Sequence, residues 1–387
     1  MAPMISTFSF PNRIIFGPGA LSQLPDLVRE QAPTSVCVVT DKGLIDAGIA
    51  TRAIDLLDSI VTTTLFDGVT PNPDIACVEA AASHLRDHET DLVIGLGGGS
   101  AMDTAKAAAL RLNHDSDLTR YEIQIGGDRH MTEAIPPVIA IPTTAGTGSE
   151  VGRSAVVTLR PANRKAVLCG PKLLPLIALC DPELTCGLPP HITAATGMDA
   201  LTHNIEAYLS TAFHPVCDAI ALGGVRRIAQ NLRTAVQDGQ NIDARSEMLL
   251  ASSMGAIAFQ KDLGAAHALA HPLSTIADLP HGLANAILLP HVMTYNKAVA
   301  ASRLKDIAQA LGCPTDSVSP ESAADLATEA VRSLAADIDI PKGLSAVGVR
   351  ADQISALVAQ AIVDPNLPTN PRPCTETDLH DLYTAAM

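Results

Sequence analysis

The sequence is short of aromatic residues and of positive charge, and both shortages narrow the possible functions. It has no tryptophan, and only 3% of its 387 residues are aromatic. Asp and Glu outnumber Lys and Arg by 41 to 26, which leaves a net charge of −15. Such an acidic chain is poorly suited to binding nucleic acid or an anionic membrane surface. No apolar run reaches the roughly 20 residues of a membrane span. We therefore expect neither nucleic acid nor a membrane as a partner.

The sequence also lacks the signs of secretion and of a cysteine-based framework. Its first eight residues have neither the basic segment nor the apolar core of a signal peptide. The eight cysteines are scattered, without a Cys-x-x-Cys motif. Cysteines of this kind are typical of reduced, mostly buried thiols. These absences predict a cytoplasmic protein without structural disulfides.

The chain has two halves with different hydrophobic patterns, and its length is typical of two domains. In the first half, short apolar runs alternate with helical periodicities, which predicts a parallel sheet with helices on both faces, a Rossmann-like α/β fold. The expected strands are 7–16, 36–40, 60–66, 91–96 and 138–141, and the expected helices are 20–30, 44–57, 75–88 and 101–112. From Pro189 on, the pattern is helical throughout. We expect an α/β domain over residues 1–188 and an all-helical domain over 189–387.

Five residues in the second half of the chain are candidate metal ligands. Asp199 and His203 are four residues apart, as are His267 and His271, and His281 follows. Residues four apart lie on one face of a helix. A carboxylate with neutral imidazoles suits Zn²⁺ or Fe²⁺ and can leave a coordination position open for substrate. We predict a divalent metal bound by four of the five.

One further acidic residue lies beside these candidates. Glu206 is close to His203 on the same predicted helix, and it could support a ligand from outside the coordination shell. A solvent-facing position is the favoured interpretation. An isolated Asp-x-x-x-His pair is itself often a surface feature, so the prediction of a metal depends on the three histidines between residues 267 and 281.

A glycine-rich turn in the first half is typical of a phosphate site. Gly97-Gly98-Gly99-Ser100 follows a predicted strand and opens a helix, where backbone N–H groups can hold a phosphate. It is neither a complete G-x-G-x-x-G motif nor a P-loop, and a plain turn is the alternative. A second polar strand end, Thr143–Gly148, favours the ligand site. Asp41 ends another strand and favours NAD over NADP, or serves only as a turn residue.

Together the motifs resemble the iron-containing (group III) alcohol dehydrogenases, nearly end to end from Phe16 to Arg372. The resemblance is carried by Gly97–Ser100 with Asp103 and Lys106, by Pro142–Glu150, by Ala195–Ala200, by His267-Ala-Leu-Ala-His271-Pro and by Pro280-His281-Gly282. It implies a nucleotide-binding α/β domain, an all-helical metal-binding domain and an active site in the cleft between them. It also implies a homodimer or higher homo-oligomer.

The resemblance assigns roles residue by residue. It implies that the metal ligands are Asp199, His203, His267 and His281, and that His271 lies beside the nicotinamide, where we expect it to relay a proton or orient the substrate. It implies cofactor contacts at Asp41, Asn72, Gly98, Gly99, Ser100, Thr143, Thr144, Thr147, Lys165 and Leu184, with Asp103 orienting the turn. The implied reaction is hydride transfer between NAD and an alcohol or its aldehyde or ketone, with Fe²⁺, or alternatively Zn²⁺, stabilising the developing alkoxide.

The substrate pocket departs from the common family pattern. Phe259 matches an aromatic pocket position, whereas Gly152 and Ala277 are small where larger residues are frequent, which predicts a roomier pocket. Arg153 and Lys261 could meet an anionic substrate tail or form ordinary surface salt bridges. Alternatives within the resemblance are a semialdehyde (hydroxy-acid) reductase, a maleylacetate reductase and a lyase resembling dehydroquinate synthase. A non-catalytic assembly protein is a further alternative, disfavoured by the intact ligand set.

Overall fold

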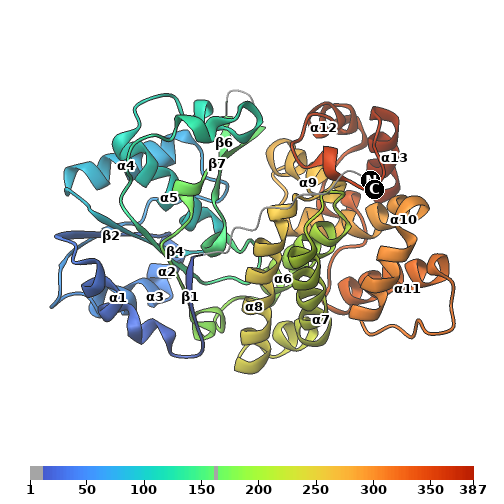
Figure 1. Cartoon of the computed structure of the whole chain (residues 1–387), viewed down its shortest axis with the longest axis horizontal. Helices are drawn as coiled ribbons and strands as arrows, with labels where there is room; N and C mark the ends of the chain where they lie inside the picture. Colours follow the sequence, from blue (N-terminus) through green and yellow to red (C-terminus); the bar gives the residue numbers. More distant parts are fainter. Residues whose placement is uncertain (1–11, 161–163) are drawn as a thin grey trace. The chain divides into compact units, whose positions relative to one another are not determined.

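The computed structural model describes residues 12–160 and 164–387, which fall into two compact units. One unit contains the described residues from 12 to 144 together with those of Gly148–Gly187. The other contains Leu188–Met387 and the short segment Ala145–Thr147. The first unit is an α/β structure and the second is helical (Figure 1).

The α/β unit is built on a sheet of six parallel strands in the order β1-β8-β5-β4-β2-β3. The strands are β1 (Arg13–Phe16), β2 (Ser35–Val39), β3 (Thr62–Phe66), β4 (Leu92–Gly97), β5 (Val138–Pro142) and β8 (Ile177–Cys180). The predicted fold class is confirmed, because every pairing in this sheet is parallel and helices separate most of its strands. Of the strand expected at 7–16, residues 7–11 lie outside the described part.

Alternate residues of the central strands face two different apolar cores, which is why these strands are apolar throughout. Val36 and Val38 of β2 pack with the helices of one face, and Cys37 and Val39 pack with those of the other. The first face is covered by α1 (Leu24–Gln31) and α3 (Ile49–Asp55), and the second by α4 (Ile75–Asp87) and α5 (Gly99–Asn113). The sheet is therefore buried on both sides, as the sequence predicts.

Two local features of this unit differ from the prediction. The single helix expected over 44–57 is divided into α2 (Lys42–Asp46) and α3, because Gly48 between them adopts a left-handed conformation with φ of 73°. An antiparallel pair that the sequence did not predict, β6 (Ser154–Leu159) and β7 (Arg164–Cys169), lies beside the main sheet. Ala155 and Leu168 of this pair pack against Leu110 of α5.

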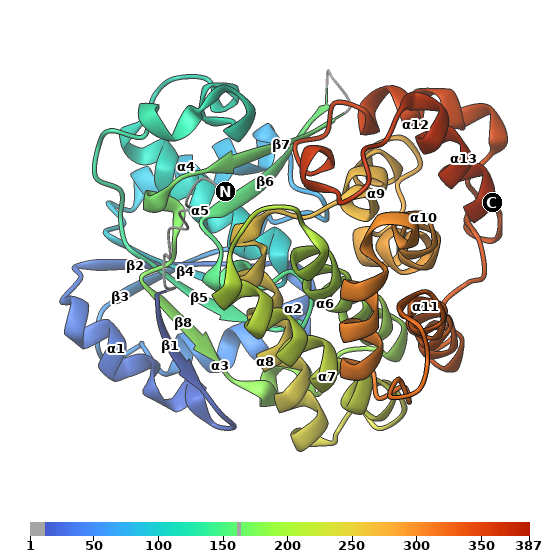
Figure 2. The ribbon, with the colours of Figure 1, turned by 45° about the vertical axis from the view of Figure 1, so that its right-hand side comes forward.

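The second unit is helical throughout from Pro190 to Ala386, as predicted, and the structure describes all of this range. Its helices are α6 (Pro190–Leu209), α7 (Pro215–Gln237), α8 (Ile242–Ala258), α9 (Ala265–Ile276), α10 (His281–Ala310), α11 (Pro320–Asp337), α12 (Ile354–Ala361) and α13 (Glu376–Ala386). Figure 2 shows α6, α7 and α8 packed along one another. Small residues permit this approach, since a Cβ on Gly224 would lie 2.0 Å from Asn204 Oδ1.

Helix α6 is the central element of this unit. Every residue from Gly197 to Leu209 is buried, so α6 has no solvent-facing stripe along this stretch. Polar side chains on such a helix must find partners inside the protein. Among the described residues, no helix combines the length and the apolar character needed to cross a membrane.

Candidate functional site

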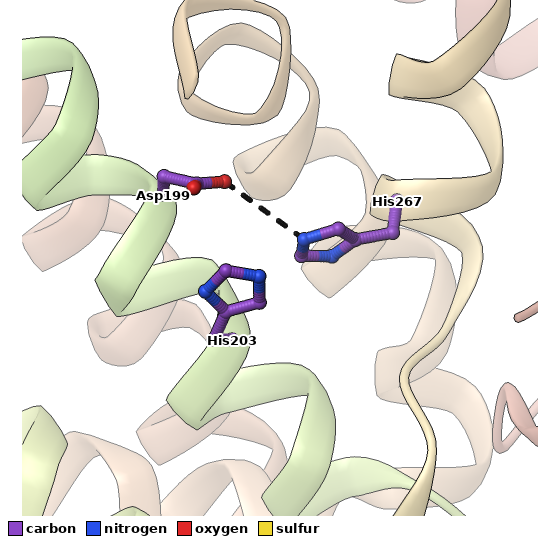
Figure 3. Close-up of side chains that lie close together, drawn as sticks. All are labelled: Asp199, His203 and His267. Atoms are coloured by element: carbon purple, nitrogen blue, oxygen red, sulfur yellow. Dashed lines mark ion pairs between the residues drawn. The ribbon is translucent and has the colours of Figure 1, made fainter. Parts of the chain in front are cut away.

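Three side chains from two helices converge in the interior of the helical unit (Figure 3). Asp199 and His203 lie one turn apart on α6, and His267 projects from the first turn of α9. One potential ligand atom from each lies within 4.8 Å of the others. All three residues are at most 5% exposed. A buried carboxylate grouped with imidazoles is the donor set that Fe²⁺ and Zn²⁺ accept.

The environment of His203 keeps its imidazole neutral. Burial lowers the pKa of His203 to about 4, outweighing the opposing effect of the Asp199 carboxylate. Its ring stacks on that of His267 with centroids 4.6 Å apart, and the ring of Phe259 lies 5.2 Å away. A neutral ring can offer a nitrogen lone pair, so His203 is in the form that a metal ligand requires.

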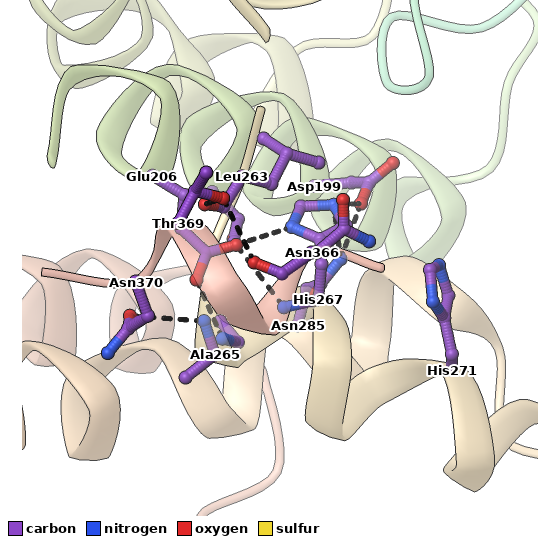
Figure 4. A network of polar contacts seen from close by, with 12 residues as sticks. Asp199, Glu206, Leu263, Ala265, His267, His271, Asn285, Asn366, Thr369 and Asn370 are labelled. Carbon is purple, nitrogen blue, oxygen red and sulfur yellow. Dashed lines mark hydrogen bonds and ion pairs between the residues drawn. The ribbon is translucent and has the colours of Figure 1, made fainter. Parts of the chain in front are cut away.

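Glu206 belongs to this site, and the favoured expectation that it faces solvent is wrong. Its side chain is 3% exposed and accepts a hydrogen bond from His267 Nδ1 at 2.7 Å. It also accepts from the backbone N–H groups of Ala266 and His267, at 2.6 and 3.2 Å (Figure 4). The carboxylate thus holds both the ring of His267 and the first turn of α9, which leaves Nε2 of His267 to face Asp199.

Asn285 is a site residue that the sequence reasoning missed. Its Nδ2 donates to Asp199 Oδ1 at 2.8 Å and lies 3.2 Å from Nε2 of both His267 and His281. One donor group therefore stands where the predicted ligand atoms converge. Its Oδ1 is buried without a hydrogen-bond partner among the described residues. Beside it, Asp199, His203 and His267 each offer a ligand atom close enough to the others to hold a metal ion. The one feature of the sequence that could have pointed to Asn285 is its position four residues after His281, one helical turn along α10.

The remaining two histidines flank this group. His281 begins α10, and its Nε2 lies 3.6 Å from Asp199 Oδ1. The ring of His271 stacks on that of His281 with centroids 5.3 Å apart. His271 Nδ1 is bonded to Asp364 Oδ2 at 2.7 Å. Nε2 of His281 therefore lies near the same Asp199 oxygen as Nε2 of His267, whereas His271 is bonded to a different carboxylate.

The glycine-rich turn and the polar end of β5 lie together in the α/β unit. The backbone N–H of Thr143 donates to the carbonyl of Gly97 at 3.0 Å, and a Cβ on Gly98 would lie 3.4 Å from Thr144 Oγ1. Gly98 caps α5, and Gly99 and Ser100 form its first turn. Asp41 lies nearby and caps α2, accepting from the N–H of Leu44 at 3.2 Å. The structure thus brings these predicted cofactor residues to one edge of the sheet.

Asp103 connects this turn to neighbouring elements. Its Oδ1 accepts from Ser149 Oγ at 2.6 Å, and its Oδ2 accepts from the backbone N–H of Val156 at 2.9 Å. Lys106 Nζ lies 3.4 Å from Asp103 and donates to the carbonyls of Ser149 and Ser154. Asp103 thus joins α5 to the residues after β5 and to β6, and the role predicted for it in orienting the turn stays a prediction.

The other predicted cofactor residues are more widely placed. The carbonyl of Asn72 accepts a hydrogen bond from Thr158 Oγ1. Lys165 on β7 lies opposite Thr158 in the antiparallel β6–β7 pair, so Asn72 and Lys165 both lie next to Thr158. Leu184 is buried in the apolar core beside the sheet. Thr147 lies in the short segment that groups with the helical unit.

The residues predicted to line the substrate pocket lie in different environments. Phe259 lies beside His203, and Ala277 caps the end of α9. Gly152 is buried, and its carbonyl lies 3.4 Å from Lys106 Nζ. Lys261 is 2% exposed, and its ammonium contacts Asp218 at 2.7 Å and the carbonyl of Tyr208 at 3.1 Å. The expectation that Lys261 forms a surface salt bridge or meets a substrate tail is therefore wrong, because its ammonium is buried and paired with Asp218. Arg153, in contrast, is exposed.

Comparison with known proteins gives a consistent result over both units. Residues 11–182 match the family model described as iron-containing alcohol dehydrogenase. Residues 193–387 match the model described as the C-terminal part of the Fe-containing alcohol dehydrogenase family. Together the two models cover nearly the whole chain.

Individual relatives agree with the family models. The chain is 39% identical over 380 residues to a 1,3-propanediol dehydrogenase of Citrobacter freundii, covering 97% of each chain. Its structure is similar to a crystal structure of 1,3-propanediol oxidoreductase, with a TM-score of 0.95 and 37% identity over 99% of this chain and 100% of the other. A sulfoacetaldehyde reductase from Bifidobacterium kashiwanohense in complex with NAD⁺ has a TM-score of 0.87 and 34% identity, covering 99% of each chain.

Proposed function

Because the chain belongs to the iron-containing alcohol dehydrogenase family, we propose that it is an NAD-dependent oxidoreductase that interconverts an alcohol and its aldehyde or ketone. In the reductive direction, a carbonyl compound, NADH and a proton give the alcohol and NAD⁺. The observation that carries the proposal is the buried group of Asp199, His203 and His267 in a chain that matches this family over both units.

The metal-binding residues are Asp199, His203, His267 and His281. Glu206 holds His267, and Asn285 holds Asp199, so two of the ligands have fixed orientations. We propose Fe²⁺, with Zn²⁺ as the alternative, since this donor set accepts both. When bound, the metal supplies a Lewis acid that polarises the carbonyl oxygen, and NADH supplies the hydride.

The dinucleotide is proposed to bind at the strand ends of the α/β unit. Gly98 and Gly99 leave the N-terminus of α5 open to a pyrophosphate, and Thr144 lies beside them. The carboxylate of Asp41 can accept hydrogen bonds from ribose hydroxyls and would repel a 2′-phosphate, which favours NAD over NADP. The NAD⁺ complex of the similar sulfoacetaldehyde reductase supports this choice.

His271 is proposed to transfer the proton. Its Nδ1 is occupied by Asp364, so Nε2 is the nitrogen that can exchange a proton with the substrate oxygen or with water. Replacing His271 with Ala should lower kcat by about 100-fold while the metal stays bound. Unchanged kcat in this variant, with full metal content, would remove His271 from the reaction.

The substrate is proposed to be a short alcohol, diol or semialdehyde. The similarity to 1,3-propanediol dehydrogenase favours a small diol or hydroxyaldehyde. The similarity to sulfoacetaldehyde reductase keeps an anionic aldehyde as the second candidate, for which exposed Arg153 is an available cation. Kinetics on a neutral and an anionic aldehyde of equal length would decide between the two.

The proposal is tested with protein purified anaerobically and loaded with Fe²⁺ or Zn²⁺. A screen of short aldehydes, semialdehydes and diols should give steady, metal-dependent NADH oxidation or NAD⁺ reduction with at least one of them. Steady net turnover also separates this activity from a lyase that regenerates its cofactor. Absence of metal-dependent turnover across the whole set would contradict the proposal.

Two further properties are proposed from the sequence and the family resemblance. They are a homodimer or higher homo-oligomer and a cytoplasmic location. Light scattering coupled to gel filtration gives the oligomeric state directly, and fractionation of the native host's cells gives the compartment.

A further inference from the structure

Asp364 and His271 form a contact that links distant parts of the helical unit. Asp364 follows α12 and precedes the short helix η12 (Leu367–Thr369), whereas His271 lies within α9. Their side chains, 93 residues apart in sequence, meet with Oδ2 at 2.7 Å from Nδ1. The two side chains are 8% and 14% exposed. A hydrogen bond this well shielded from water is stronger than one at the surface.

The Asp364 carboxylate is itself held in place. Its Oδ1 accepts from the backbone N–H of Asn366 at 2.9 Å and from Asn366 Nδ2 at 3.0 Å. With Oδ1 occupied by these donors, Oδ2 is left for His271. Burial acts to raise the pKa of Asp364, but His271 and Asn366 outweigh it, and the pKa is lowered. All three of these partners are nitrogen atoms, and the two from Asn366 are donors, so the carboxylate is placed to act as an acceptor.

An acceptor at Nδ1 determines which imidazole nitrogen carries the proton. The Nδ1–H must point at Asp364, so the neutral ring has its lone pair on Nε2. Without this acceptor, the ring could take either tautomer and turn about its side-chain bonds. We propose that Asp364 is a positioning residue that fixes the tautomer and the orientation of His271, so that Nε2 faces the reacting oxygen. This inference rests on the proposed role of His271.

The first test observes the tautomer directly. Metal-free or zinc-loaded protein labelled with ¹⁵N-histidine should show His271, identified by its absence in His271→Ala, with a protonated Nδ1. In Asp364→Ala the two nitrogen signals should move toward the averaged values of an exchanging ring. In Asp364→Asn the amide oxygen should stay with the two Asn366 donors and the NH2 group should face His271 Nδ1, so the ring should shift to the tautomer protonated on Nε2. A His271 spectrum unchanged in Asp364→Ala would overturn the proposal.

The second test measures catalysis. Asp364→Ala should lower kcat for aldehyde reduction by about 10- to 100-fold, as for other residues that orient a functional histidine, with the KM for NADH and the metal content within twofold of wild type. Asp364→Asn should lose at least as much, because its NH2 group favours the tautomer with the proton on Nε2. Asp325→Asn is a matched control, because that carboxylate is exposed and pairs only with Lys297 among the described contacts. Equal losses in the control and in Asp364→Ala would overturn the proposal.

A double variant separates positioning from a general structural role. If Asp364 acts through His271, adding Asp364→Ala to His271→Ala should lower kcat by less than twofold further. An undiminished loss in the double variant would show that Asp364 acts independently of His271. Should the protein reduce no aldehyde at all, the proposed function fails, while the NMR test still decides whether Asp364 sets the tautomer.

Discussion

Glu206 illustrates how a single carboxylate can determine the geometry of a ligand it supports. It accepts from one imidazole and two backbone N–H groups while almost fully buried. Removing its charge would weaken all three contacts at once, because hydrogen bonds to an ionised acceptor are stronger than those to a neutral one. The residue lies outside the proposed ligand set, so its effect on the metal must pass through His267.

Glu206→Gln is therefore expected to weaken metal binding. The affinity should fall by about 10- to 100-fold, since the amide cannot accept equally well from His267 Nδ1 and the two backbone donors. Competition against a chromophoric chelator measures this change. Glu329→Gln, at an exposed position paired only loosely with Arg332, is the control and should leave the affinity unchanged. Equal affinities for Glu206→Gln and wild type would show that the carboxylate does not support the ligand.

The sequence predicted the convergence of Asp199, His203 and His267 but not the residues that support it. Spacing of four residues is visible in the sequence and places side chains on one helix face. Whether that face is buried depends on neighbouring helices, so the environment of Glu206 was predicted wrongly. Asn285 was missed because an asparagine has no distinctive spacing rule, although it lies one turn after His281.

At the scale of elements, the cap of α4 gives a pH-dependent contribution to stability. Asp74 accepts from the N–H of Cys77 at 3.0 Å, and Arg160 Nε lies 3.1 Å from its other oxygen. The hydrogen bond from Cys77 is the largest factor that lowers the pKa of Asp74, with burial opposing it. A carboxyl group whose pKa is lower in the folded state stabilises the fold above its unfolded pKa of about 4. This contribution is lost as the pH falls through the folded value.

Asp74→Ala should thus destabilise the protein by about 1 kcal/mol at pH 7 and by less at pH 3. Asp74→Asn retains a capping oxygen and should lose little of the stability, with a weaker dependence on pH. Urea unfolding followed by circular dichroism at both pH values measures these differences. A cost of Asp74→Ala that is the same at pH 7 and pH 3 would contradict the linkage to ionisation.

The segment after β5 is held by one buried cation. Lys106 is fully buried, and its Nζ donates to Ser149 Oγ at 2.5 Å and to the carbonyls of Ser149 and Ser154 at 2.9 and 2.6 Å. Burial lowers the pKa of Lys106, and Asp103 opposes this effect. The residues it holds begin at Ser149, five positions after Thr144, and Thr143 and Thr144 are proposed to contact the cofactor.

Lys106→Met removes the ammonium donor, so Ser149 Oγ and the carbonyls of Ser149 and Ser154 should be left unsatisfied. The chain after β5 should then be held less tightly. We expect the Kd for NADH to rise by about tenfold, corresponding to about 1.4 kcal/mol, with the metal content unchanged. Fluorescence titration with NADH measures the affinity. Lys172→Met is the control, since that ammonium is exposed and bonded to carbonyls elsewhere. An unchanged Kd for NADH would show that the segment does not depend on Lys106.

Elements with strong periodicity were predicted well, and those set by local conformation were not. The apolar strand β4 and the helix α5 after it have clear patterns, and their ends differ from prediction by at most two residues. The division between α2 and α3 depends on the conformation of Gly48, which composition alone does not determine. The pair β6–β7 was missed because β7 begins with two charged residues, Arg164 and Lys165, and so lacks the continuous apolar run of a buried strand.

At the scale of the whole molecule, the proposed metal ligands and the glycine-rich turn lie in different units. Asp199, His203, His267 and His281 belong to the helical unit, and Gly98, Gly99 and Asp41 belong to the α/β unit. Each unit has its own apolar core. In the sequence, the change from alternating to helical periodicity falls between the same two groups of motifs. Binding of the metal and of the dinucleotide should therefore be separable.

Removing the metal with a chelator should abolish aldehyde reduction yet leave NADH binding within about threefold of the loaded protein, a difference of less than 1 kcal/mol. Metal removal should also lower the unfolding temperature of the helical unit, because an ion that binds only the folded state stabilises it by mass action. Calorimetry and NADH titration on the same chelated sample measure the unfolding temperature and the affinity for NADH, and adding Fe²⁺ back should restore aldehyde reduction and the unfolding temperature. A chelated protein that loses NADH binding by more than tenfold would show that the two sites are energetically coupled.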